Sequence, residues 1–124
     1  MKHDNLKERT KKLALRIIRI VEELPKGNTA DVIGRQLLRS GTSVAANYRA
    51  ACRAKSAADF ISKMGTVEEE TDESLFWMEI LIEAKLVNDD RLEDLMVETH
   101  EILKIVVSSI KTAKDTQRNA ERKI

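Results

Sequence analysis

Apolar residues recur every three or four positions along most of the chain, which is the period of an amphipathic α-helix. Four segments carry this pattern, over about residues 5–24, 29–55, 57–87 and 90–113. The inward positions of the first segment are Leu6, Thr10, Leu13, Ile17, Val21 and Leu24, whereas Leu15 and Ile18 fall outside that face and need another partner. The third and fourth segments point the following residues inward: Phe60, Met64, Val67, Thr71, Leu75, Met78 and Ile82, then Leu92, Leu95, Met96, Thr99, Leu103, Val106 and Ile110.

Short polar stretches separate the four segments. Pro25 ends the first helix, Thr29 is the expected N-cap of the second, and Ser56 with Asp59 resembles a capping box for the third. Short connections place consecutive helices side by side, so we predict an all-α fold, an up-down-up-down antiparallel four-helix bundle over residues 1–113. The polar segment 114–124 lacks an apolar period and is expected to fray.

Composition agrees with a helical, cytoplasmic protein. Of 124 residues, 42% are hydrophobic and 35% charged, with one proline and four glycines, so turn-forming residues are scarce. Cys52 is the single cysteine, which excludes an internal disulfide and favours a reducing compartment. No apolar run approaches the ~20 residues of a membrane span, and nothing near Met1 resembles a secretory signal.

The stretch 32–55 is the most informative part of the chain. Wound as one helix, it places Ile33, Leu37, Val44, Tyr48 and Ala51 on one face, with Ser40 and Asn47 at its edge. The apolar phase survives the Ser-Gly-Thr-Ser run at 40–43, which predicts a bent but continuous helix. Gly41 then indicates a place where another helix comes close, and Cys52, beside the apolar face, is expected to pack rather than react.

The opposite face of this helix carries a row of arginines within an arc of about 80°: Arg35, Arg39, Arg49 and Arg53. Guanidinium groups in a row suit phosphate oxygens, so this face is the candidate site for RNA or a nucleoprotein partner. The alternative is ion pairing with the acidic run 68–73 or with a neighbouring subunit. Residues 1–55 hold 13 Lys and Arg against 5 Asp and Glu, and the remainder is acidic, which fits either interpretation.

A second candidate surface lies on the third helix. Its members point away from the predicted core, and they are Phe76, Trp77, Ile80 and Ala84. Bulky apolar groups turned outward within two turns usually mark an interface, so we predict self-association here.

Motifs for catalysis, cofactors and metals do not occur. The Glu-x-x-His pair of carboxylate metal sites fails at His100, which is preceded by Val97. A single cysteine cannot form a zinc site of the usual spacing, and no phosphate-binding glycine loop is found. We therefore predict a non-enzymatic protein with no catalytic residues, no metal and no cofactor.

The run QLLRSGTSVAANYRAA at 36–51 resembles the signature of the four-helix-bundle proteins named after the intervening sequences of 23S ribosomal RNA. The similarity continues through SAADF at 56–60, ETDESLFW at 70–77 and LIEAKL at 81–86, and covers about residues 6–112. The resemblance implies a bacterial cytoplasmic protein and a ring-shaped homopentamer. It also implies kinship with the accessory protein of diversity-generating retroelements, which works with nucleic acid.

Carried over to this chain, the basic helix positions of the family are Arg39 and Arg53, with Arg35 and Arg49 as local additions. Two functions stay open. One is an oligomeric bundle that docks RNA or a nucleoprotein through the arginine face. The other is a protein–protein scaffold without nucleic-acid binding. Near-neutral net charge and an acidic third helix count against RNA, whereas the resemblance favours it.

Overall fold

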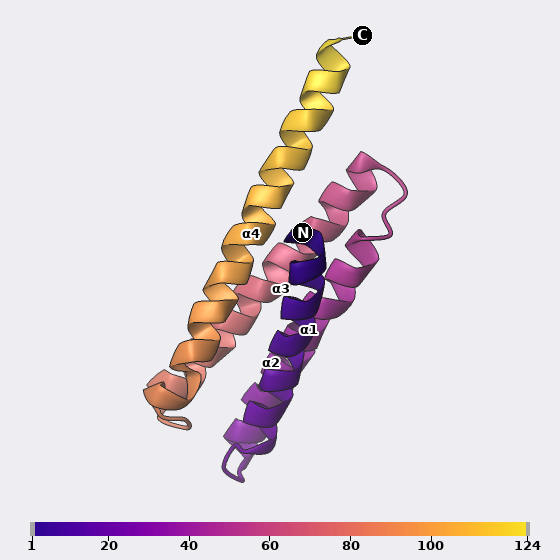
Figure 1. The fold of residues 1–124 in the computed structure, drawn as a ribbon. Helices are drawn as coiled ribbons and strands as arrows, with labels where there is room; N and C mark the ends of the chain where they lie inside the picture. Colours follow the sequence, from indigo (N-terminus) through magenta and orange to yellow (C-terminus); the bar gives the residue numbers. More distant parts are fainter. Residues whose placement is uncertain (1, 124) are drawn as a thin grey trace.

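Four helices follow one another along the chain with short connections. The structure is a computed structural model that describes residues 2–123, with side chains from Asn5 onward. The helices are α1 (Lys2–Glu22), α2 (Asn28–Ala51), α3 (Ala57–Glu83) and α4 (Asp89–Arg122). Each runs antiparallel to its predecessor (Figure 1), which confirms the predicted all-α four-helix bundle.

Each helix packs on its neighbours in sequence, α1 and α4 also contact each other, and the other two pairs lie diagonally. The α2–α3 contact is the most extensive, followed by α1–α2 and α3–α4, whereas α1 and α4 share the least contact. Among the described residues, no Cα atom of α1 lies within 8 Å of one in α3, and the same holds for α2 and α4. The corners occupied by α1 and α3 are therefore on opposite sides of the bundle.

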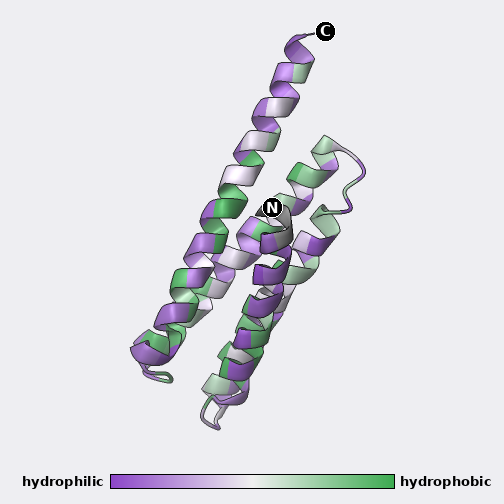
Figure 2. Ribbon diagram, viewed as in Figure 1, coloured by the Kyte–Doolittle hydropathy of each residue, from purple (hydrophilic) through white to green (hydrophobic). Residues whose placement is uncertain are grey.

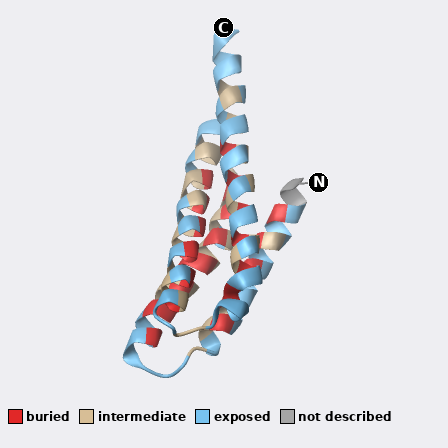
Figure 3. Cartoon of the chain, turned by 90° about the vertical axis from the view of Figure 1, so that its left-hand side faces the viewer, coloured by how far each residue is buried: buried red, intermediate tan, exposed pale blue. Residues whose placement is uncertain are grey.

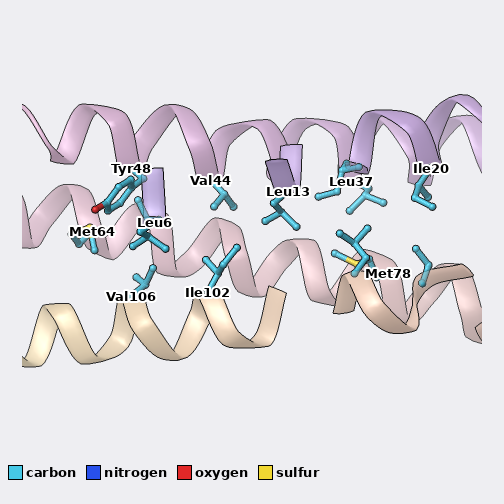
Figure 4. Packing of buried hydrophobic residues seen from close by; sticks show 14 of the residues in the cluster. Leu6, Leu13, Ile20, Leu37, Val44, Tyr48, Met64, Met78, Ile102 and Val106 are labelled. Carbon is cyan, nitrogen blue, oxygen red and sulfur yellow. The ribbon is translucent and has the colours of Figure 1, made fainter. Parts of the chain in front are cut away.

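The core runs along the centre of the bundle and is almost entirely aliphatic (Figure 4). The predicted inward positions of α1, α2 and α3 are buried or packed against the core cluster. On α4 one predicted inward position is wrong: Leu103 is only half-buried, and its neighbour Ile102 is buried in its place. Both residues fit the three-and-four spacing, because Leu103 follows Thr99 by four positions and precedes Val106 by three. The rotation of α4 in the bundle, which the spacing does not determine, buries Ile102 in preference.

Both ends of the second helix differ from the predictions, and the third helix ends at Glu83 rather than near residue 87. The second helix begins at Asn28, with Gly27 as its N-cap at φ 149°, and no side chain caps it; Thr29 already lies inside the helix. Glycine makes this turn without the cost that other residues incur at positive φ. The second helix also ends at Ala51 rather than near residue 55. The predicted cap of α3 is confirmed, because the Asp59 N–H donates to the Ser56 hydroxyl at 3.0 Å.

The last helix continues to Arg122, beyond the expected end near Ala113, and Ile124 lies outside the described residues. Its final turns extend past the other three helices (Figure 1) and are largely exposed (Figure 3). Polar residues also dominate this end in Figure 2. Asp115 lies 3.4 Å from Lys111 and 3.6 Å from Arg118, so ion pairs along the helix support it in place of apolar contacts. None of the described helices combines the length and apolarity that crossing a bilayer requires.

Candidate interaction surfaces

The second helix is continuous through the Ser-Gly-Thr-Ser run, as predicted. The Thr42 hydroxyl donates to the Leu38 carbonyl at 2.8 Å, so the hydroxyl is satisfied within the helix. A Cβ atom at Gly41 would lie 2.4 Å from Ile17 Cδ1, and one at Gly34 would lie 2.9 Å from Leu24 Cδ1. Both glycines therefore admit α1 at close range, which confirms the interpretation of Gly41.

The four arginines do not form one uniform row. Arg35, Arg39 and Arg49 are exposed on the outer face of α2, whereas Arg53 lies in the turn that follows the helix. Arg39 leans toward α3, where it forms ion pairs with Glu70, at 3.3 Å, and with Glu73. The hydrogen bond to Glu73, and then the charge of Glu70, raise the pKa of Arg39. Pairing with the acidic run is thus confirmed for Arg39.

Within residues 5–123, no ion pair involves the other three arginines. Arg35 and Arg49 are separated by 14 residues, or about 21 Å along a helix. Between them the outer face carries only one further arginine, and acids from α3 already engage it. The structure therefore offers isolated guanidinium groups for a partner rather than a continuous basic strip.

A buried pair of hydroxyls joins α2 to α3. Ser40 and Ser74 are fully buried, with their oxygens 3.0 Å apart. The Ser40 hydroxyl donates to the Leu37 carbonyl at 3.2 Å, and Ser74 lies 2.9 Å from the Glu70 carbonyl. Of the two polar residues at the edge of the apolar face, Ser40 thus links two helices, whereas Asn47 donates locally to the Ser43 carbonyl at 2.8 Å. Backbone carbonyls and the two serines themselves satisfy these hydroxyls, so the pair holds α2 against α3 and is not a ligand site.

The predicted aromatic surface on α3 is mixed in exposure. Phe76 is 49% exposed and Ala84 is exposed, whereas Trp77 and Ile80 are half-buried and packed against the core cluster. The Phe76 and Trp77 rings meet edge to face at 4.8 Å. The Trp77 indole N–H donates to Glu73 at 3.2 Å, which places both aromatic rings beside the acids of α3. We call Phe76, Trp77, Ile80 and Ala84 the aromatic patch.

Among the described residues, no three His, Cys, Asp or Glu side chains come together as metal ligands would. His100 is exposed on α4. Cys52 is also exposed, so the expectation that it packs is wrong, because α2 ends one residue earlier and the thiol follows the turn outward.

Comparison with protein families matches residues 3–108 to the family described as 23S rRNA-intervening sequence protein. The chain belongs to this family. A crystal structure from *Bacteroides thetaiotaomicron*, described as a protein of unknown function from the S23 ribosomal protein family, is similar, with 35% identity and a TM-score of 0.84. The alignment covers 90% of this chain and 99% of that one. Comparison with curated proteins gave no match.

The region matched to the 23S rRNA-intervening sequence family ends before the projecting part of α4. It includes both glycines against α1, the hydroxyl pair and the aromatic patch. Sequence reasoning missed two of these features, Gly34 and Ser74. Gly34 could have been found from its spacing, because it precedes Gly41 by seven residues, or two helical turns, and so lies on the same face.

Proposed function

We propose that this member of the 23S rRNA-intervening sequence family is a non-enzymatic protein that assembles with copies of itself into an oligomeric scaffold. The observation that carries the proposal is the exposure of Phe76, two turns before the end of a helix whose inner face is already buried. Family resemblance supplies the expected number of subunits, five, and the expected location, the bacterial cytoplasm. The exposed thiol of Cys52 fits such a reducing compartment.

The aromatic patch has the anatomy of an interface centre. Aromatic residues are enriched at the centres of protein interfaces, where a large rigid side chain fills a pocket on the partner. Phe76 is held by the edge of Trp77, so little side-chain entropy would be lost when it is covered. The buried polar groups, by contrast, are hydroxyls of Thr10, Ser40, Thr71, Ser74 and Thr99, which carry no acid–base chemistry.

Light scattering of purified protein tests the assembly. We expect the wild-type chain to have several times its 14.1 kDa mass, and Phe76→Glu to reduce it to a monomer with unchanged helical content. Trp77→Glu should also dissociate the oligomer, but it removes core packing as well, so Phe76 gives the cleaner result. Val97→Glu is the matched control, because Val97 is 60% exposed on α4. A monomeric wild-type protein would refute the proposal.

Docking of RNA through Arg35, Arg39, Arg49 and Arg53 is the second candidate. Exposure of all four residues and the family's link to ribosomal RNA favour it. The ion pairs of Arg39 and the acids of α3 favour the scaffold instead. The two functions differ in the response of binding to salt.

Phosphate contacts would make log affinity for a single strand fall with log salt, at a slope of about −0.7 per contact. Changing Arg35, Arg49 and Arg53 to Ser should then abolish binding of a 23S rRNA fragment and leave the oligomer intact. Arg39→Ser serves as the comparison, since it also removes the ion pairs to α3. No binding by the wild-type oligomer at low salt would leave the scaffold as the function.

A further inference from the structure

A second outward apolar spot lies on α1, and no helix of the chain covers it. Leu15 is 50% exposed and Ile18 is half-buried, both on the side away from the main core face. A single exposed leucine is ordinary on a protein surface. The nearest charges along its own helix, however, are all basic: residues 11–19 contain Lys11, Lys12, Arg16 and Arg19, and the acids Glu8 and Glu22 lie two turns away on either side.

The aromatic patch on α3 has the opposite surroundings. Between Met64 and Ala84 the helix contains seven acids and no lysine or arginine. Glu70 and Glu73 are engaged by Arg39, whereas other acids of this stretch are exposed: Glu69, Asp72, Glu79 and Glu83. Each apolar spot therefore has a charged rim, basic on α1 and acidic on α3.

The two spots also lie at the same height along the bundle. The first and third helices run in the same direction (Figure 1), and Leu15 and Phe76 each precede the last residue of their helix by seven positions. This spacing puts both about 10 Å from the same end. Because α1 and α3 occupy opposite corners and do not contact each other, one protomer cannot bring its own two spots together.

We infer that the occupant of the aromatic patch is the α1 surface around Leu15 of a second copy. Two copies in the same orientation would place Leu15 against Phe76, with Lys11 and Lys12 beside Asp72 and Glu73. The contact joins two different surfaces, so in a pair one copy keeps a free α1 surface and the other keeps a free aromatic patch for further copies. This inference rests on the proposed self-assembly and names the surface that completes it.

Mixing two variants, each with one of the two surfaces disrupted and the other intact, tests the pairing. The first is Leu15→Glu, which puts an acid opposite the acidic rim. The second is the double variant Phe76→Gln and Ile80→Gln, which removes the apolar part of the patch. We expect each alone to be monomeric by light scattering, with wild-type circular dichroism. Mixed in equal amounts, they should form a dimer and nothing larger, because only one intact contact remains for each pair.

The outcomes separate the two proposals. A dimer in the mixture supports the pairing of α1 with α3. An oligomer of wild-type mass formed by Leu15→Glu alone would overturn this inference and leave self-assembly through the aromatic patch intact. A monomeric wild-type protein would overturn the proposed self-assembly itself. Val97→Glu serves again as the matched control, since it adds one acid to an exposed position on α4 and should retain the wild-type mass.

Discussion

The first helix meets its two neighbours in different ways. Against α2 it packs at short range, with Ile17 over Gly41 and Val21 over Gly34. Against α4 the contact is sparse, and long charged side chains bridge it. Arg9 donates to Glu98 through both Nε and Nη2, at 2.9 and 2.7 Å, and Arg91 pairs with Glu23 nearer the other end.

The difference shows what a close helix contact requires. Glycine lets two backbones approach until aliphatic side chains fill the space between them, and dispersion then acts over the whole contact. The contact with α4 has no such small residue at its centre. An open groove remains there, with Leu6, Phe60 and Ile105 among its lining residues. Its ion pairs are partly exposed and screened, so they orient α1 more than they stabilise it.

The largest effect is expected where the approach is closest. Gly41→Val would force its side chain into Ile17, which is fully buried and has little room to move. Overpacking of this kind should cost about 3 kcal/mol in the free energy of unfolding. Urea denaturation at a fixed protein concentration measures it.

Gly65→Ala on α3 is the control for helix propensity. No atom lies within 4 Å of a Cβ built there, so alanine should add about 0.5–1 kcal/mol of stability. If Gly41→Val were as stable as the wild type, α1 would not pack on α2 at the distance described.

An intermediate effect is expected at the hydroxyl pair between α2 and α3. Ser40→Ala or Ser74→Ala leaves the other buried hydroxyl with one partner fewer, at a cost of about 1 kcal/mol each. The double variant should cost less than the two single changes added together, because removing the second serine leaves nothing unsatisfied. Urea denaturation of the wild type, the two single variants and the double variant gives the four free energies of unfolding that this double-mutant cycle needs. Strict additivity would mean that the two oxygens do not interact.

Helical periodicity predicted most of this architecture, because apolar positions three and four apart must share a face. It predicted the continuity of α2, the close approach at Gly41 and the cap at Ser56. It failed where a single residue decides the outcome. A glycine at positive φ, and not a side-chain cap, starts α2, and the helix then ends just before Cys52, whose thiol is exposed.

The candidate surfaces were less predictable than the fold. One helix wheel places Arg35, Arg39 and Arg49 on a common outer face, but it cannot say which of them a neighbouring helix reaches. That depends on the rotation of α3, which brings Glu70 and Glu73 to Arg39 alone. The same limit applies to Leu15. The sequence indicates that it needs a partner, but the heights of Leu15 and Phe76 along the bundle come only from the packed helices.

The smallest effect is expected at the contact between α1 and α4. Hydrogen bonding from Arg9 lowers the pKa of Glu98, although partial burial opposes the shift. A lowered pKa in the folded state means that the pair stabilises the protein above the ordinary glutamate range. That stabilisation is lost as the pH falls through the lowered pKa. Since the Arg9 and Glu98 side chains are 33% and 28% exposed, Glu98→Gln should cost only about 0.5 kcal/mol at neutral pH.

Thermal unfolding followed from neutral to acidic pH distinguishes this ion pair from the general effect of acid. The difference in melting temperature between the wild type and Glu98→Gln should shrink as the pH falls, because the wild-type carboxylate becomes protonated and loses its charge. Glu101→Gln is the matched control on the same helix, since Glu101 forms its ion pair along α4, with Lys104 at 3.3 Å, and acts on Arg9 only through its more distant charge. Its difference from the wild type should be smaller at neutral pH. A constant difference for Glu98→Gln at every pH would mean that the amide disturbs packing and that the charge of Glu98 does not hold α1 against α4.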